Sequence, residues 1–187
     1  MNYRCLQKHS FRHGDYEIVP IRHEDIFKIM KWRNEQLHIL RQDHILTEEE
    51  QENYYRNVIV PSFSQEKPKQ ILFSFLEKGV CIGYGGLVHI DWESRRGEVS
   101  FLMETERSKD EAKYRKDFTD FLSLIKQVAK DLRFHRLHSE LFDIRPLHQE
   151  LLESLGFQRE GRMKEHIFVH GQYVDSIIHG CVLNYDA

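Results

Sequence analysis

The stretch Glu98–Phe157, EVSFLMETERSKDEAKYRKDFTDFLSLIKQVAKDLRFHRLHSELFDIRPLHQELLESLGF, decides the fold. Two runs within it, Glu98–Met103 and Leu137–Phe142, have the pattern of strands. Between them, apolar residues recur three and four apart from Phe118 to Leu132, which is typical of an amphipathic helix. Strand–helix–strand units of this kind form parallel pairs in a sheet. We therefore predict an α/β fold whose sheet contains a parallel pair made of these two runs.

The pattern on either side of this unit predicts the order β-α-α-β-β-β-α-β-α-β-β. This order is a mixed sheet of about seven strands with flanking helices. The first strand is expected at Tyr16–Ile21. A capping box, Thr47 with Glu50, should open the second helix, which we expect to end before Pro61. Residues 105–118 are expected to form a charged loop in front of the long helix.

Composition places the chain among ordinary globular proteins. Its 187 residues are 40% hydrophobic and 30% charged, which suits one domain, and we expect residues 1–14 to be a loose N-terminal arm before a domain at 15–187. A net charge of −3 gives no case for a nucleic-acid or membrane partner. The three distant cysteines and the absence of an apolar leader favour free thiols and a cytoplasmic location. The sequence contains neither an HExxH nor a CxxC motif, so we expect no metal site.

Several short motifs occur in a characteristic order along the chain. They are WRN at 32–34, CIGYGGL at 81–87, the glutamate that opens the next strand, LESLGFQREG at 152–161 and GQYVD at 171–175. As an ordered set they resemble the GNAT superfamily of acetyl-CoA-dependent N-acetyltransferases over about residues 16–183. Within it, the chain is most similar to the branch of ribosomal-protein N-terminal and sugar-nucleotide amine acetyltransferases.

The resemblance implies that acetyl-CoA is the acetyl donor and that its pantetheine arm lies between two splayed parallel strands. The strand and helix residues implied at this site are Phe101, Leu102, Met103, Phe142, Arg145 and His148. The family's pyrophosphate loop normally reads Arg/Gln-x-x-Gly-x-Gly/Ala, but residues 105–118 contain no glycine. Cations in that segment could bind the phosphates instead: Arg107, Lys109, Lys113, Arg115 and Lys116. The alternative is a solvated charge run without such a role.

A second departure follows the strand at 137–142. Many relatives have an asparagine and a serine that contact the cofactor where this chain has Arg145 and His148. Leu152 stands where many relatives carry a tyrosine as general acid, a loss that the resembled branch shares.

Glu98 is the first candidate for the catalytic base. It opens the strand expected beside the thioester, and a carboxylate can accept a proton from an ammonium group. The alternative is a surface carboxylate paired with Arg95 or Arg96. His89 is the second candidate because its ordinary pKa suits a base, although structural histidines are common. His135, His138 and His166 are weaker candidates.

The end of the first helix and the following loop should form the acceptor mouth, according to the resemblance. The residues expected to bind the acceptor are Trp32, Arg33, Asn34, Arg41 and Tyr84. The alternative is that Trp32 belongs to the core and Arg33 to a structural ion pair.

Three functions remain open at this point. The first is acetyl transfer to a small primary amine such as an amino-sugar nucleotide, and the second is acetylation of a protein N-terminus. The missing glycines motivate the third, a non-catalytic acyl-CoA-binding or interaction module. A homodimer is included among the expected partners.

Overall fold

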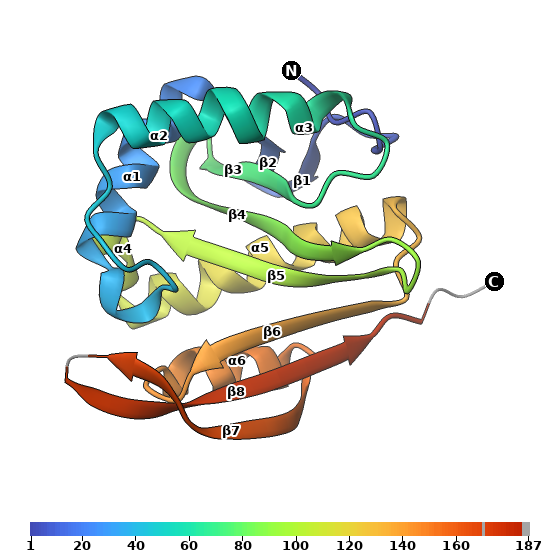
Figure 1. Ribbon diagram of the computed structural model, residues 1–187. Helices are drawn as coiled ribbons and strands as arrows, with labels where there is room; N and C mark the ends of the chain where they lie inside the picture. Colours follow the sequence, from blue (N-terminus) through green and yellow to red (C-terminus); the bar gives the residue numbers. More distant parts are fainter. Residues whose placement is uncertain (170, 185–187) are drawn as a thin grey trace.

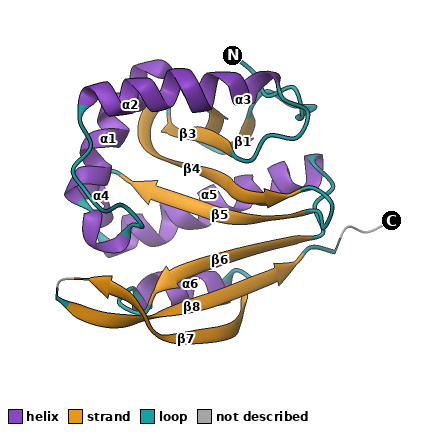
Figure 2. Cartoon of the chain, viewed as in Figure 1, coloured by secondary structure: helices purple, strands orange, loops and turns teal. Residues whose placement is uncertain are grey.

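The computed structural model describes residues 1–169 and 171–184, so residue 170 and residues 185–187 of the predicted domain lie outside it. One eight-stranded sheet runs through the protein, with helices on both of its faces (Figures 1 and 2). The predicted α/β fold with a mixed sheet is confirmed.

The strands are β1 (Phe11–His13), β2 (Tyr16–Pro20), β3 (Ile71–Glu77), β4 (Val80–Asp91), β5 (Arg96–Met103), β6 (Arg136–Phe142), β7 (Gln158–Val169) and β8 (Gln172–Val182). The helices are α1 (Ile26–Glu35), α2 (Glu48–Tyr54), α3 (Val60–Ser64), α4 (Thr105–Ser108), α5 (Glu111–Asp131) and α6 (Pro146–Ser154). The sheet order is β1-β2-β3-β4-β5-β6-β8-β7. Only β5 and β6 pair in parallel among these described strands, and α5 connects them, as the strand–helix–strand pattern predicts.

The N-terminal residues are packed, which corrects the expectation of a loose arm over residues 1–14. Tyr3, Leu6 and Phe11 are buried, and β1 pairs with β2 as the eighth strand. The Tyr3 hydroxyl donates to the carbonyl oxygen of Leu72 at 3.0 Å and accepts from its N–H at 2.8 Å. These three apolar residues anchor a segment whose average composition is polar and basic.

The second helix continues beyond its expected end. The Thr47–Glu50 capping box is present, but a π-helical turn at Tyr55–Ile59 joins α2 to α3, and Pro61 lies inside α3. Pro61 directly follows the π-helical turn, in which the N–H of Val60 bonds to the carbonyl of Tyr55, five residues back. Proline is tolerated there because the regular i→i−4 ladder is already interrupted where proline lacks its N–H.

Residues 105–118 are helical, which corrects the expectation of a charged loop. After α4, only Lys109 and Asp110 precede α5, which begins at Glu111 rather than near Phe118. The segment is rich in Glu, Lys and Arg, which favour helix. The side chain of Asp110 caps α5 by accepting from the N–H of Lys113 at 3.1 Å.

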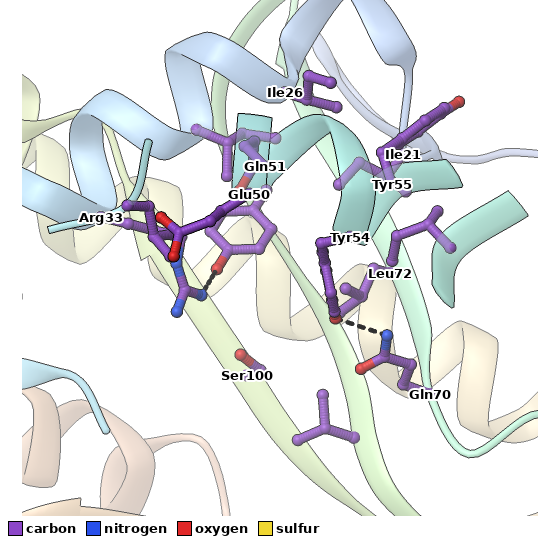
Figure 3. A pocket seen from close by; sticks show the side chains of 15 residues that line it. Ile21, Ile26, Arg33, Glu50, Gln51, Tyr54, Tyr55, Gln70, Leu72 and Ser100 are labelled. Carbon is purple, nitrogen blue, oxygen red and sulfur yellow. Dashed lines mark hydrogen bonds between the residues drawn. The ribbon is translucent and has the colours of Figure 1, made fainter. Parts of the chain in front are cut away.

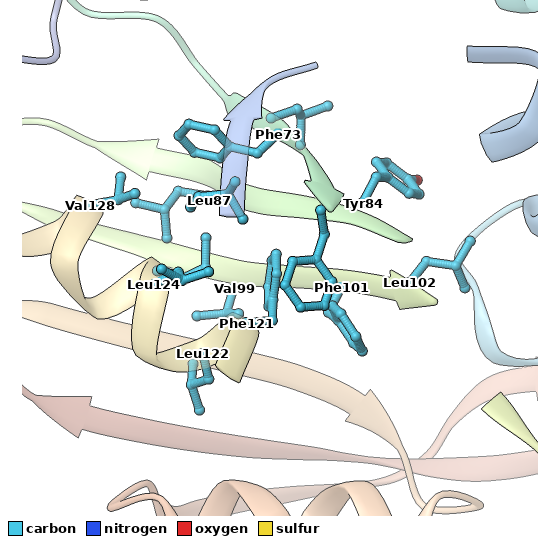
Figure 4. Packing of buried hydrophobic residues seen from close by; sticks show 14 of the residues in the cluster. Phe73, Tyr84, Leu87, Val99, Phe101, Leu102, Phe121, Leu122, Leu124 and Val128 are labelled. Carbon is cyan, nitrogen blue, oxygen red and sulfur yellow. The ribbon is translucent and has the colours of Figure 1, made fainter. Parts of the chain in front are cut away.

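The apolar face of α5 packs against the sheet as its periodicity predicts (Figure 4). The ring of Phe101 lies 4.6 Å from Phe121 and 5.2 Å from Phe118, measured between centroids. Gly85 permits this packing, because a Cβ there would lie 2.1 Å from the carbonyl oxygen of Ser100 and 2.7 Å from the Phe121 ring. The odd-numbered residues of β5 therefore face α5, and Glu98 and Ser100 face the opposite side.

Candidate active site

The parallel strands β5 and β6 separate after three residue pairs, the last of which is Glu98 with His138. Both strands continue beyond this pair without contact in the ladder, and Figure 1 shows them diverging. The carbonyl of Arg95 accepts from the N–H of His135, so strand alternation directs the N–H of Phe101 toward β6 as well. The register gives that N–H no partner in β6. The predicted splayed pair is thus present.

A cleft of about 530 Å³ fills the space between the separating strands. Its walls include Glu98, Val99, Ser100 and Phe101 from β5, Ser139, Glu140 and Leu141 from β6, and Arg41, His89, Arg145 and His148 from neighbouring segments. This cleft has the position and the free backbone groups that an extended pantetheine arm requires.

Glu98 stands where the cleft opens, with 12% of its side chain exposed. The guanidinium of Arg41 donates to its Oε1 at 2.8 Å and to the backbone oxygen of Glu140 at 3.2 Å. Its Oε2 lies 4.0 Å from the Nε2 atoms of both His89 and His138. Glu98 is therefore a largely buried carboxylate whose ion-pair partner is Arg41. The alternative expected from the sequence was a surface carboxylate paired with Arg95 or Arg96.

His89 reaches Glu98 from a distorted position in β4. The β4–β5 register shifts between Val88 and Asp91, and His89 has a φ of 47°, which is left-handed. Bulges redirect side chains, and strained backbone of this kind clusters at functional sites. The two residues predicted from the sequence as bases therefore lie beside one another.

A second cavity, of about 300 Å³, lies between α1, α2 and strands β3 to β5 (Figure 3). Most of its lining is apolar or aromatic: Ile21, Ile26, Ile29, Leu46, Tyr54, Tyr55, Ile59, Leu72, Tyr84 and Val88. Arg33, Gln70, Val88 and Ser100 line both this cavity and the cleft, so the two spaces meet at β4 and β5. We call this space the acceptor cavity.

Three residues predicted for the acceptor mouth lie at these spaces. Arg33 donates to the Tyr84 hydroxyl and, at 2.8 Å, to Oε1 of Gln42, and both Arg33 and Tyr84 line the acceptor cavity. Arg41 lines the cleft. The ion pair that we considered for Arg33 is replaced by bonds to neutral groups.

Trp32 and Asn34, also predicted for the mouth, have structural surroundings. Trp32 is buried in the core. The Asn34 side chain donates to the carbonyl of Leu46 at 2.9 Å and accepts from its N–H at 2.8 Å, which holds the loop before α2. Neither residue lines the cleft or the acceptor cavity.

The apolar residues predicted to bind the cofactor are buried, and of these only Phe101 lines the cleft. Leu102, Met103 and Phe142 pack in the interior. The backbone oxygen of Met103 accepts from Nε2 of Gln36 at 2.8 Å, so that carbonyl is already occupied.

The cations predicted to bind phosphates all have carboxylate partners. Arg107 pairs with Asp117 and Glu77, Lys109 with Glu106, Lys113 with Asp110, Arg115 with Glu111 and Glu150, and Lys116 with Asp120. Arg107 is the most committed of them, because Asp117 is buried and the bond is bidentate. The other four cations are more exposed than Arg107, although Asp120, the partner of Lys116, is buried. Their role at a cofactor stays a prediction.

Arg145 and His148 lie at the start of α6, where the cleft continues into a space of about 730 Å³ between α4 and α6. We call this space the α4–α6 cavity. Arg145 Nη2 donates to the Tyr114 hydroxyl at 2.8 Å, and that hydroxyl lies 2.7 Å from Nδ1 of His148. Burial lowers the pKa of His148 well below its ordinary value.

Because His148 is buried, we expect the free energy of unfolding to depend on pH. At pH values above its ordinary pKa of 6.5, the ring is neutral in both the folded and the unfolded chain. Below that pH the unfolded chain takes up the proton first, so we expect His148 to reduce the free energy of unfolding by about 1.4 kcal/mol per pH unit. Urea denaturation at several pH values measures this slope. In His148→Gln, the free energy of unfolding should fall less steeply below pH 6.5 than in the wild type. An identical slope would show that His148 does not cause the pH dependence.

Two residues at the site were underrated from the sequence. His138 pairs in register with Glu98, which could have been found by aligning the two parallel runs. Tyr114 was missed because its segment was taken as loop; as helix, it falls one turn before Phe118 on the buried face of α5.

The chain matches the family described as acetyltransferase (GNAT) domain over residues 18–178. It is similar in structure to the spermidine N-acetyltransferase from Vibrio cholerae in complex with CoA and spermine, with a TM-score of 0.77 and 18% identity over 91% of this chain and 96% of that chain. It is also similar to the ribosomal L7/L12 α-N-protein acetyltransferase RimL in complex with CoA, with a TM-score of 0.74 and 10% identity over 93% of this chain and 97% of that chain. No curated protein matches the sequence.

The splayed strands, the cleft and the family match define an acetyltransferase fold with a place for a pantetheine arm. The chain belongs to the GNAT acetyltransferase family and is an acetyl-CoA-dependent N-acetyltransferase. Among the helices of the described residues, none combines the length and the apolar character needed to cross a membrane.

Proposed function

We propose that the chain acetylates a compact primary amine, which binds in the acceptor cavity and meets acetyl-CoA beside Glu98. The observation that carries this proposal is the junction of the two spaces. Arg33, Gln70, Val88 and Ser100 line both, and Ser100 is two residues along β5 from Glu98 on the same face. An amine entering through the acceptor cavity would therefore approach the cleft at the proposed base.

Glu98 is the proposed proton acceptor. A bound ammonium group must lose a proton before its nitrogen can attack, and a carboxylate within reach can take it. Arg41 must first release Glu98, because its guanidinium bonds to that carboxylate. His89 is 4.0 Å from Glu98 and largely exposed, so it can pass the proton on to solvent.

The backbone of β5 supplies the remaining group. Acetyl-CoA would contribute an acetyl thioester in the cleft. The amine nitrogen would form a bond to the thioester carbonyl carbon, the carbon–sulfur bond would break, and CoA would leave as a thiolate that takes a proton from solvent. The N–H of Phe101 points into the splay without a strand partner, and it can donate to the oxyanion that develops during acyl transfer.

The acceptor cavity favours a small amine with an apolar body. Its volume of about 300 Å³ is at the low end for ligand sites, and its lining carries one cation, Arg33, and one carboxylate, Glu50. Of an amino-sugar nucleotide, only the amino sugar fits a space of this size. The α-amino group and first side chain of a protein N-terminus are the second candidate. Polyamines are the third class of amine to be tested, because the chain is similar in structure to a spermidine N-acetyltransferase.

Thiol release from acetyl-CoA with an amine panel tests the proposal. We expect turnover with at least one compact primary amine. The KM for that amine should rise in Tyr84→Phe and in Glu50→Gln. Amino-sugar nucleotides, N-terminal peptides and polyamines separate the acceptor classes. Saturable acetyl-CoA binding without thiol release from any amine would contradict the proposal and favour the non-catalytic module.

Two further expectations are kept as proposals. The three free thiols, Cys5, Cys81 and Cys181, support a reducing, cytoplasmic compartment. A homodimer is proposed because a spermidine N-acetyltransferase neighbour is described as dodecameric, and it can be checked by light scattering.

A further inference from the structure

The start of α5, where the resembled family binds a diphosphate, is closed here by the chain's own acids. Oδ1 of Asp110 accepts from the N–H of Lys113 at 3.1 Å, and Glu111 follows in the first turn. A carboxylate thus stands where helix amides would receive an anion. The nearby cations Lys113 and Arg115 are also paired with carboxylates.

Arg145 differs from the other predicted cofactor-binding cations. Over residues 1–169 and 171–184, its hydrogen-bond partner is the Tyr114 hydroxyl, and it forms no ion pair with a carboxylate. Its charge is therefore not neutralised by the protein. It lines both the cleft and the α4–α6 cavity, at the point where they join.

A buried network holds this guanidinium in place. Tyr114 and His148 are both buried, and the His148 ring packs 4.4 Å from Phe118 between centroids. Burial keeps His148 neutral, so its Nδ1 can accept from the Tyr114 O–H while the phenol oxygen accepts from Arg145. The guanidinium is fixed by neutral groups, and its remaining N–H donors are left for an anion.

The α4–α6 cavity has room for a diphosphate and little unpaired negative charge. Its volume is about 730 Å³. Of the two carboxylates that line it, Glu106 pairs with Lys109 and Glu35 accepts from the Thr105 hydroxyl. α6 has no side-chain cap, so the amides of its first turn are not blocked by a side chain of its own.

We propose that the diphosphate of CoA binds at Arg145 in the α4–α6 cavity rather than at the start of α5, and that Tyr114 and His148 position the Arg145 guanidinium. This deepens the proposed function by naming where the donor is anchored. It does not depend on which amine is acetylated or on the role of Glu98.

Calorimetric titration with CoA and with 3′-dephospho-CoA tests the site without turnover. Arg145→Ala should weaken binding of both ligands by the same factor, about 10- to 100-fold, because both carry the diphosphate. Tyr114→Phe keeps the packed ring but loses the hydroxyl, and it should weaken both ligands by a smaller factor. Arg145→Lys should recover part of the affinity. Arg12→Ala, which removes an equal charge from β1, should bind both ligands as the wild type does.

S-acetylpantetheine is the complementary acetyl donor for this test, because it lacks the diphosphate. Arg145→Ala should lower the kcat/KM for acetyl-CoA by a larger factor than the kcat/KM for S-acetylpantetheine. A loss for CoA but not for 3′-dephospho-CoA would assign Arg145 to the 3′-phosphate and overturn the proposal. So would equal losses with both acetyl donors, or wild-type affinity in Arg145→Ala together with weak binding in Lys113→Ala or Arg115→Ala. Absence of amine turnover in a protein that binds CoA normally would overturn the proposed function and leave this site standing.

Discussion

Glu98→Gln is expected to lower kcat by a factor of about 100 to 10,000 while the protein remains folded. Glutamine has nearly the same size and can still accept a hydrogen bond from Arg41, which donates to Oε1 of Glu98 at 2.8 Å. It cannot accept the proton of an ammonium group. Glu98 is the largely buried carboxylate at the point where β5 and β6 separate. Glu140, which also lines the cleft and pairs with Arg41 at 3.4 Å, accepts a hydrogen bond from the Ser176 hydroxyl at 2.7 Å.

The measurement is steady-state thiol release with the best amine of the panel, combined with a melting curve and a CoA titration. The melting temperature and the CoA affinity should stay close to those of the wild type. A high-pH rescue is expected, because an amine that is already neutral no longer needs the base. Unchanged kcat near neutral pH would show that Glu98 is not the base, and His89 or His138 would then be tested in the same way.

Arg107→Ala is expected to lower the melting temperature by about 6–20 °C. Arg107 forms a bidentate bond to Asp117, which is 1% exposed, and a second bond to Glu77 at 2.9 Å. Its removal leaves the Asp117 charge buried with the Tyr16 hydroxyl, 2.8 Å away, as its remaining partner. Loss of one member of a buried ion pair typically costs about 3–5 kcal/mol.

Thermal denaturation of three variants checks this prediction. Asp117→Asn combined with Arg107→Ala should recover part of the loss, because the unpaired charge is then gone. Arg115→Ala should melt near the wild-type temperature, since its ion pairs are on the surface. A wild-type melting temperature for Arg107→Ala, with a raised KM for acetyl-CoA, would instead return Arg107 to the phosphate site.

The architecture could be predicted because it depends on local pattern. The runs at 98–103 and 137–142 and the apolar face of α5 are each visible in sequence, and together they require a parallel pair. Three local expectations differed from the structure. Pro61 continues a helix because a π-helical turn directly precedes it, residues 105–118 are helical except at Lys109 and Asp110, and Tyr3 ties the N-terminal segment to the core.

The position of a candidate site residue could be predicted where its place in a strand fixes it. Glu98 and His89 were chosen this way; the structure brings them within 4.0 Å of one another, and their role as bases stays a prediction. The cations were less predictable, because a charged side chain takes whichever partner the fold brings near. Arg107 meets Asp117 from the next helix, and Arg41 crosses from the loop before α2 to Glu98. The hydroxyl that holds Arg145 comes from Tyr114, in a helix that the charge run concealed.

Amide hydrogen exchange with and without acetyl-CoA tests the central claim, that the donor lies between the separated strands β5 and β6. The N–H groups of Phe101 and Glu140 face the splay without a strand partner, so they should exchange quickly in the free protein. Saturating acetyl-CoA should slow exchange at both positions and leave the β7–β8 pair unchanged. Exchange at Phe101 and Glu140 that is unaffected by up to about 1 mM acetyl-CoA, a weak-binding limit for such a ligand, would contradict the account.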